Sequence, residues 1–199
     1  MKQIIKESIP GFFSKFVAHN KPRTWDESAP IRPELRAHIL AEQGNCCAYT
    51  EIRLKNDTDC HIDHYRTRNL FPEKTFDYFN MMVSCNAEGY GAKSKDKQIT
   101  SRSDYDDLIN PVEDNPADYI EFAFTGDALP VSGSSKGTKT ITYFNLNEKS
   151  LLERRRIIAL YVVQMKNYFT EDEMVETTGE FESMVRQIYR KCSAIVTDI

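Results

Sequence analysis

The segment CHIDHYRTRN, residues 60–69, gathers the side chains of this chain that are best suited to chemistry. It contains His61, Asp63, His64, Arg66 and Arg68, including two of the four histidines in the protein. A histidine can accept a proton from water near neutral pH, a carboxylate can hold a divalent cation, and guanidinium groups match phosphate oxygens. Three interpretations of these residues are open: a metal-dependent nuclease centre, a zinc site, or an ordinary polar strand.

The period of a strand constrains how these groups can cooperate. Neighbouring residues of a strand point to opposite faces, so Asp63 and Tyr65 share one face while Ile62 and His64 share the other. For Asp63 and His64 to act on one phosphate, the strand has to bend or a metal has to be held through a different atom. His61 is either an accessory active-site group or an outward-facing strand residue.

The first half of the chain predicts a helix and a hairpin around this segment. Residues 33–43 have a proline in the first turn and an apolar face, and Gly44 ends the helix. Residues 46–54 and 60–65 read as two strands joined by a turn at 55–59. A loop over 66–77 follows, and the segment 78–86 leads into a short helix near 85–94.

The second half predicts further small elements and two longer helices. A connector over 103–116 precedes a second hairpin, in which YIEFAF (119–124) alternates and LPV (129–131) returns. Residues 139–144 read as a strand. Ser150 and Glu153 form a capping box before a helix over 151–169. The helical spacing of a last helix over 179–194 places these residues in the core: Phe181, Met184, Val185, Ile188 and Cys192.

The composition limits the class of protein. The 199 residues are 40% hydrophobic with a net charge of −4, and no apolar run is long enough to cross a membrane. We expect a cytoplasmic protein with no membrane partner, and we interpret the N-terminus as mature sequence rather than a signal peptide. Five cysteines form an odd, sparse set, which favours reduced thiols over a disulfide scaffold. Residues 60–102 carry a local excess of basic side chains, and the acidic remainder allows a partner to supply the larger basic groove.

The order of motifs resembles the HNH, or ββα-metal, nuclease superfamily. The pair Asp63-His64 is followed by Phe71-Pro72, then Tyr78-Phe79-Asn80, then Ser84-Cys85-Asn86. Within the superfamily, this order is most similar to the branch that serves as the HNH subunit, PtuB, of Septu and retron-associated antiphage systems. The resemblance is specific over 31–98 and continues more weakly through Asn110-Pro111, Gly126 and the segment from Asn145 to Arg154.

The resemblance implies a role for each matching residue. His64 corresponds to the general base and Asp63 to a metal ligand. Asn80 is a second catalytic residue, which fixes the loop and orients the base. No histidine follows residue 64, so Asn86 is the nearest candidate for the last metal ligand. The candidate nucleic-acid contacts are Arg66, Arg68 and Lys93. The alternative interpretation of each is a solvated surface charge without a ligand.

The cofactor implied by these ligands is a divalent metal, Mg²⁺ or Mn²⁺, because both prefer oxygen ligands. Many relatives also carry two Cys-x-x-Cys pairs that hold a structural zinc. Here Cys47 would pair with Thr50, and Cys85 with Glu88 or Tyr90, so two thiols remain where four ligands are needed. Structural zinc is therefore not expected, although Cys46 or Cys60 could substitute.

The expected architecture is a single α+β domain over residues 1–199. It comprises an N-terminal helical lead (1–45), a ββα-metal core (46–98), and an extension (99–199) with a small β-hairpin and C-terminal helices. The resemblance implies an endonuclease subunit of an antiphage complex with an ATPase resembling PtuA, acting on DNA or RNA, with transfer RNA a candidate. A retron reverse transcriptase and its msDNA are further candidate partners. The alternative is a degenerate HNH-fold adaptor that binds the ATPase or nucleic acid without cleaving.

Overall fold

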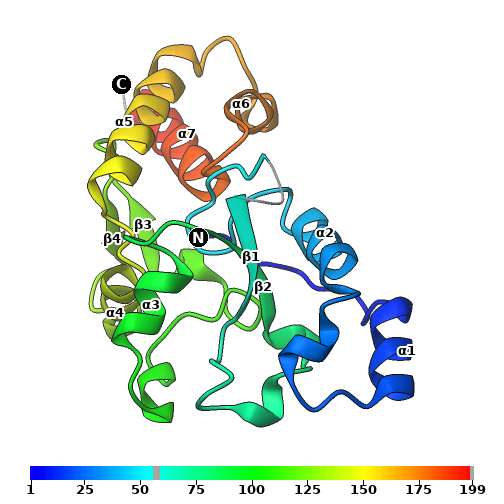
Figure 1. Ribbon diagram of the computed structural model, residues 1–199. Coiled ribbons are helices and arrows are strands. Elements are labelled where there is room, and N and C mark those ends of the chain that lie inside the picture. Colours follow the sequence, from blue (N-terminus) through cyan, green and yellow to red (C-terminus); the bar gives the residue numbers. More distant parts are fainter. Residues whose placement is uncertain (56–58, 198–199) are drawn as a thin grey trace.

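A two-stranded antiparallel sheet lies at the centre of the computed structural model, which describes residues 1–55 and 59–197 (Figure 1). Strand β1 (Cys60–His64) pairs with β2 (Met81–Cys85), so that Cys60 lies opposite Cys85 and His64 opposite Met81. Helix α3 (Ala92–Gln98) follows β2, which makes the local order strand, strand, helix. The two strands are joined by a loop over residues 65–80, which contains the short 3-10 turns η3 (Pro72–Lys74) and η4 (Tyr78–Asn80).

Helices α1 (Gly11–Asn20) and α2 (Arg32–Glu42) lie on one side of this sheet (Figure 1). Between them is the 3-10 turn η1 (Trp25–Ser28). The helix expected over 33–43 is confirmed, and its apolar face packs on β1 and β2 through the buried side chains of Leu35 and Ile39. Gly44 follows with a φ of 67°, a left-handed conformation that favours glycine and ends the helix.

The hairpin expected over 46–65 is wrong, because the partner of β1 comes from later in the chain. Residues 46–54 form no strand and contribute only an isolated bridge between Cys46 and Arg53. Glu51 adopts a φ of 62° and donates its backbone N–H to the Cys47 carbonyl, which folds this segment into a compact turn, called the knuckle below. The knuckle also bonds to β2 from Ala48 N to Val83 O. The expected turn at 55–59 includes residues 56–58, which lie outside the described residues.

The short helix expected near 85–94 starts later than predicted. Residues 81–85 are all buried and pair as β2, and α3 begins at Ala92, directly after Gly91 with a φ of 74°. A β-carbon at Gly91 would lie 3.3 Å from the Ser84 hydroxyl and 3.5 Å from the Cys85 sulfur, so the close approach of α3 to β2 depends on glycine here.

The second hairpin is confirmed, but the next predicted strand is a helix. Strands β3 (Ile120–Phe122) and β4 (Ala128–Pro130) pair antiparallel. Residues 139–144 were expected as a strand, but 139–143 belong to α4 (Ser135–Tyr143) and Phe144 is its C-cap. The first turn of α4 is capped by the Ser134 hydroxyl, which accepts from Gly137 N. A β-carbon at Gly137 would lie 2.1 Å from the Tyr119 carbonyl, so β3 and α4 can approach each other only with glycine at this position.

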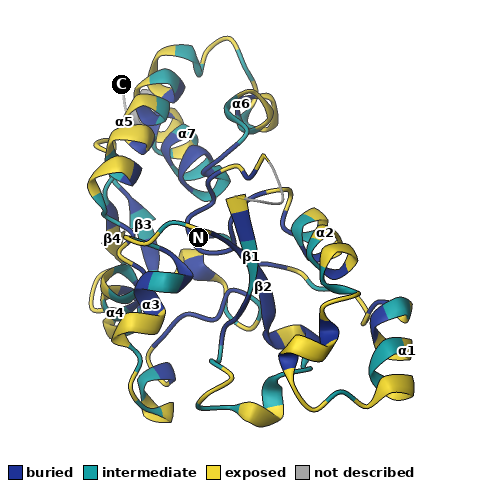
Figure 2. Ribbon diagram, in the orientation of Figure 1, coloured by how far each residue is buried: buried dark blue, intermediate teal, exposed yellow. Residues whose placement is uncertain are grey.

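Three C-terminal helices complete the fold: α5 (Lys149–Met165), α6 (Glu171–Thr178) and α7 (Glu182–Thr197). The five core residues expected in the last helix are all buried. Helix α5 starts two residues earlier than expected, and its N-cap is Glu148, which accepts from Ser150, rather than the predicted box of Ser150 and Glu153. Figure 2 shows the buried faces of these helices turned toward one another.

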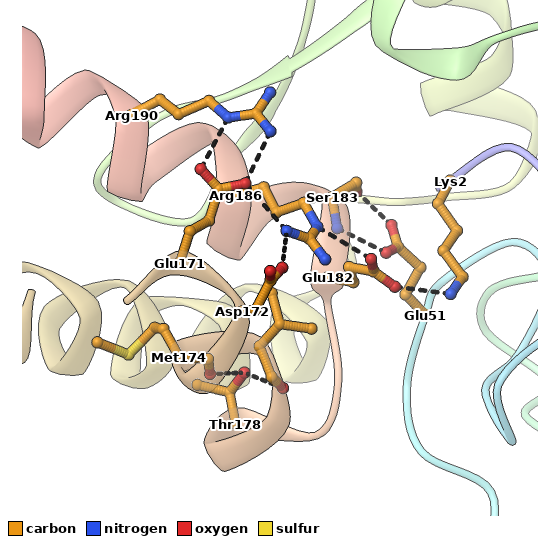
Figure 3. Close-up of polar contacts among 11 residues, drawn as sticks. Lys2, Glu51, Glu171, Asp172, Met174, Thr178, Glu182, Ser183, Arg186 and Arg190 are labelled. Carbon is orange, nitrogen blue, oxygen red and sulfur yellow. Dashed lines mark hydrogen bonds and ion pairs between the residues drawn. The ribbon is translucent and has the colours of Figure 1, made fainter. Parts of the chain in front are cut away.

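An ion-pair network holds α6 and α7 to the N-terminus and the knuckle (Figure 3). Arg186 pairs with Glu171 of α6 and with Glu182 one turn back on α7. Lys2 pairs with Glu182, and the Met1 amino group lies 2.5 Å from the buried carboxylate of Glu51. The C-terminal helices are therefore tied to the same knuckle that bonds to β2.

The α+β class expected from the sequence is confirmed by the mixture of helices and small antiparallel sheets. The strand-strand-helix order of β1, β2 and α3 is compatible with the expected core, while its binding of a metal stays a prediction. None of the helices in the described part of the chain has both the length and the apolar character to span a bilayer.

Candidate functional site

A cavity of about 430 Å³ opens between β1, the loop that follows it and the C-terminal end of α3. The polar groups at its wall that could act chemically are His61, Asp63, His64, Arg68 and Asp96. Four of these are sequence-predicted site residues, and Asp96 is new. Asp63 and His64 both reach this cavity even though they are neighbours on a strand.

His64 is held as a neutral imidazole. Its Nε2 lies 2.9 Å from the Thr75 carbonyl oxygen, and since a carbonyl can only accept, Nε2 carries the proton. The ring is buried and meets the Trp25 ring edge-on, with 4.7 Å between centroids. Burial lowers the pKa of His64 to about 4. At neutral pH, Nδ1 therefore keeps a lone pair that can accept a proton.

Asn80 acts on the loop that carries the Thr75 carbonyl. Its side-chain Oδ1 accepts from the backbone N–H of Arg66, and its Nδ2 donates to the carbonyls of Arg66 and Lys74. The amide thus joins the start of the loop after β1 to the residue preceding Thr75. Asn80 does not line the cavity, and that it orients His64 through this loop stays a prediction.

Asp63 is a buried carboxylate with two donors. The Tyr49 hydroxyl donates to its Oδ2, and the Lys95 ammonium lies 3.1 Å from the same oxygen. Burial alone would raise the pKa of Asp63, but the charge of Lys95 and the hydrogen bond from Tyr49 lower it below its usual value. Asp63 is therefore ionised at neutral pH.

Lys95 joins two carboxylates to the end of β1. Its ammonium lies 3.2 Å from Asp96 Oδ1 and 2.9 Å from the Tyr65 carbonyl, and its side chain is fully buried. Burial opposes the charge on Lys95, yet Asp63 and Asp96 raise its pKa above the ordinary value. The pKa of Asp96 is raised by burial and by the nearby Asp63 charge, against the opposing effect of Lys95.

The remaining predicted site residues lie in other contacts. His61 Nδ1 lies 2.8 Å from Asn86 Oδ1, so Asn86 orients His61 at the cavity wall. Arg66 pairs with Glu113 in a neighbouring cavity. Lys93 pairs at 2.7 Å with the exposed Glu88 and lines neither of these two cavities.

Cys47 and Cys85, the two thiols at the positions expected for a structural zinc, lie close together. The Cys85 backbone N–H donates to Cys47 Sγ at 3.4 Å, and the Ser84 hydroxyl lies 3.6 Å from the same sulfur. All five cysteines are buried free thiols. Within residues 1–55 and 59–197, no three His, Cys, Asp or Glu side chains converge closely enough to hold a metal by themselves.

Four further residues lie around the site without having been predicted from the sequence: Trp25, Tyr49, Lys95 and Asp96. Trp25 is the only tryptophan of the chain, which could have drawn attention to it. Lys95 lies between Lys93 and Lys97 in the sequence, a spacing that is typical of a solvated surface. In the helix, Lys95 instead falls on the same buried side as Ala92, three residues earlier.

Two known proteins are similar in sequence to this chain. A candidate HNH endonuclease of retron Ec83 from Escherichia coli is 25% identical over 201 residues, which covers 78% of this chain and 78% of that protein. Septu protein PtuB from Bacillus mycoides (strain KBAB4) is 40% identical over 94 residues, which covers 45% of this chain and 32% of PtuB. The chain resembles PtuB and a retron HNH endonuclease. The resemblance expected from the order of Asp63-His64, Asn80 and Asn86 is thereby confirmed at the level of these relatives. No protein-family model matches the chain.

Proposed function

We propose that this chain is a metal-dependent HNH endonuclease subunit that hydrolyses phosphodiester bonds of nucleic acid. The observation that carries the proposal is the shared cavity of His64 and Asp63, with one ring nitrogen of His64 held by the Thr75 carbonyl. The names of the two relatives, a retron HNH endonuclease and Septu PtuB, support the same class of activity.

In the proposed reaction, Nδ1 of His64 accepts the proton of the attacking water. The Thr75 carbonyl orients the ring through Nε2, and Asn80 holds the loop on which Thr75 lies. Arg68 is exposed at the cavity wall, where its guanidinium can bind the phosphate oxygens. Asn80 is thus a positioning residue, while His64 contacts the reacting water.

The carboxylates at the cavity are the type of ligand that a small divalent cation binds, and in this structure the Lys95 ammonium pairs with both of them. Mg²⁺ is commonly held by one or two carboxylates, with water and substrate phosphate completing the shell. Asp63 and Asp96 would supply those carboxylates, and His61 lies on the same wall. Asn86 stays a predicted ligand, although its Oδ1 is engaged by His61. When bound, such an ion stabilises the negative charge that develops on the leaving oxygen.

The partners remain part of the proposal. We infer an ATPase subunit resembling PtuA, with a retron reverse transcriptase and msDNA as further candidates. Helix α5 exposes Ile157, Leu160 and Val163, an apolar surface of the kind that protein partners cover. Replacement of Ile157 and Leu160 by Asp should abolish co-purification with the ATPase without changing the melting temperature.

The proposed function is tested with purified protein, alone and with its ATPase, on labelled DNA, RNA and transfer RNA with Mg²⁺ or Mn²⁺. His64→Gln should lower the cleavage rate by roughly 10²- to 10⁴-fold, the usual contribution of a general base. His19→Ala provides the matched control, because His19 is exposed at the end of α1. Chelation should stop cleavage, and Asp63→Asn should reduce its rate at every metal concentration.

One outcome decides against the nuclease, and another against the role proposed for His64. If no nucleic acid is cut under any of these conditions, the enzyme interpretation fails. If His64→Gln cuts as fast as the wild type, His64 is not the base. In the first case, intact assembly with the ATPase would favour the adaptor alternative.

A further inference from the structure

A second cavity, of about 680 Å³, lies beside the proposed nuclease site. It is bounded by the loop after β1, by the 3-10 turn η5 (Arg102–Tyr105) with the residues that follow, and by Lys136 of α4. The same loop separates the two cavities. Its residues 67–70 line the cavity of His64, and Arg66, Phe71, Glu73 and Lys74 line the second cavity.

An aromatic floor gives this second cavity a stacking surface. Phe71 is partly exposed and meets the Tyr105 ring edge-on at 5.4 Å between centroids, and Tyr105 in turn meets Tyr65 at 5.5 Å. The Tyr105 hydroxyl accepts from the Thr67 backbone N–H at 3.0 Å, which joins η5 to the loop. The Phe71 ring is therefore held in place from below.

A displaceable side chain covers the ring of Phe71. The guanidinium carbon of Arg102 lies 4.5 Å from the Phe71 centroid, and Arg102 is otherwise held by Glu73 at 3.2 Å. Both side chains of this ion pair are more than half exposed, and exposed pairs contribute little to stability. A planar ligand can therefore displace the guanidinium from the ring, or insert beneath it, with a small energetic penalty.

The charges around the cavity are balanced rather than basic. Among the described residues that line it, four are cationic and four are acidic: Arg66, Lys74, Arg102 and Lys136, against Glu73, Asp106, Glu113 and Asp114. A groove for the phosphate backbone would have an excess of positive charge. The edge of a nucleobase presents both donors and acceptors, so a balanced lining suits a base better than a phosphate.

We propose that this second cavity binds an unpaired nucleobase of the substrate strand, stacked on Phe71, next to the phosphate that is cut at His64. This inference rests on the proposed nuclease function and adds a substrate preference to it. A base inside a duplex cannot reach a ring at the floor of a cavity, so substrates with an unpaired nucleotide at the cleavage point should be preferred over perfect duplex.

Binding is measured in a cleavage-deficient His64→Gln background, and cleavage is measured with chains that retain His64. The probes are single-stranded DNA and RNA oligonucleotides with 2-aminopurine at successive positions, and the same sequences as duplexes. One 2-aminopurine position should lose fluorescence on binding, as a stacked base does. Phe71→Leu, which keeps apolar volume but removes the ring, should abolish that quenching and weaken single-strand binding roughly 10- to 100-fold.

Two further variants keep the test decisive. Phe71→Tyr retains a ring and should restore both binding and quenching, which a merely structural role of Phe71 would not require. Phe124→Ala removes an exposed aromatic ring from the β3–β4 hairpin and should change neither measurement. Melting temperatures identify any variant that fails to fold.

The outcomes separate this inference from the proposed function. If the wild type cuts nucleic acid but Phe71→Leu keeps the same quenching and the same preference for single strands, only the nucleobase site is overturned. Equal cleavage of unpaired and fully paired substrates also overturns it. If the chain neither binds nor cuts any of these probes, with or without its ATPase, both proposals fail.

Discussion

The ammonium of Lys95 lies 3.1 Å from the Asp63 carboxylate, and both side chains are buried beside the proposed catalytic histidine. A helix that follows β2 thus supplies the charge that keeps a strand carboxylate ionised. The same ammonium reaches Asp96 and the Tyr65 carbonyl, so one lysine joins α3 to the end of β1. The position of Asp63 at the cavity therefore depends on the docking of α3.

Lys95→Met should destabilise the protein by about 3–5 kcal/mol, because it leaves the Asp63 carboxylate buried without its opposite charge. Denaturant unfolding measures the change. The double variant Lys95→Met with Asp63→Asn should recover part of the loss, since the amide needs no counter-charge. Equal stability of Lys95→Met and wild type would show that Asp63 is solvated or protonated without Lys95.

The buried His64 predicts a pH-dependent stability in metal-free protein. Its folded pKa is about 4 and its ordinary value is 6.5, so between these pH values the unfolded chain binds a proton that the native chain does not. The free energy of unfolding should therefore decrease as the pH falls from 6.5 to 4, by about 1.4 kcal/mol per pH unit from this residue. Urea unfolding with a chelator present, compared between wild type and His64→Gln, isolates this contribution. Identical pH profiles for the two proteins would contradict it.

Arg68 and Lys93 should differ in their effect on nucleic-acid binding. Arg68 is exposed at the cavity of His64, whereas Lys93 pairs with Glu88 away from that cavity. Arg68→Ala should weaken binding and reduce the salt slope of log K by about 1, the effect of one lost phosphate contact. Lys93→Ala should have the smaller effect in the same anisotropy titration. A larger effect of Lys93→Ala than of Arg68→Ala would indicate that nucleic acid binds along α3 rather than at the cavity of His64.

Thiol reactivity and metal content test the expectation that structural zinc is missing. All five cysteines are free and buried, so an aromatic disulfide reagent should react slowly with the native protein and with five thiols per chain in denaturant. Zinc measured on the same sample should be well below one ion per chain. The sequence disfavours a structural zinc site. One tightly held zinc per chain, whose release makes the thiols of Cys47 and Cys85 reactive, would establish that site.

Local patterns in the sequence were sufficient for several elements. Helix 33–43, the β3–β4 hairpin and the buried stripe of α7 follow from helical or strand periodicity and from turn residues, which depend on neighbours close in the chain. The strand predicted over residues 46–54 was wrong, because this segment folds into the compact knuckle, in which Glu51 has a positive φ. The strand predicted over residues 139–144 was wrong, because the local sequence pattern does not show that Gly137 lets α4 pack against Tyr119.

The candidate site divides in the same way. The sequence by itself determined which residue types are available, and the order of Asp63-His64, Asn80 and Asn86 was enough to indicate the resemblance to PtuB and its retron relative. Only the tertiary structure decided that β1 pairs with residues 81–85, that Lys95 is buried against Asp63, and that Asn86 contacts His61. These contacts join residues 17 to 32 positions apart, and their free energy comes from burial and charge pairing that no local periodicity encodes.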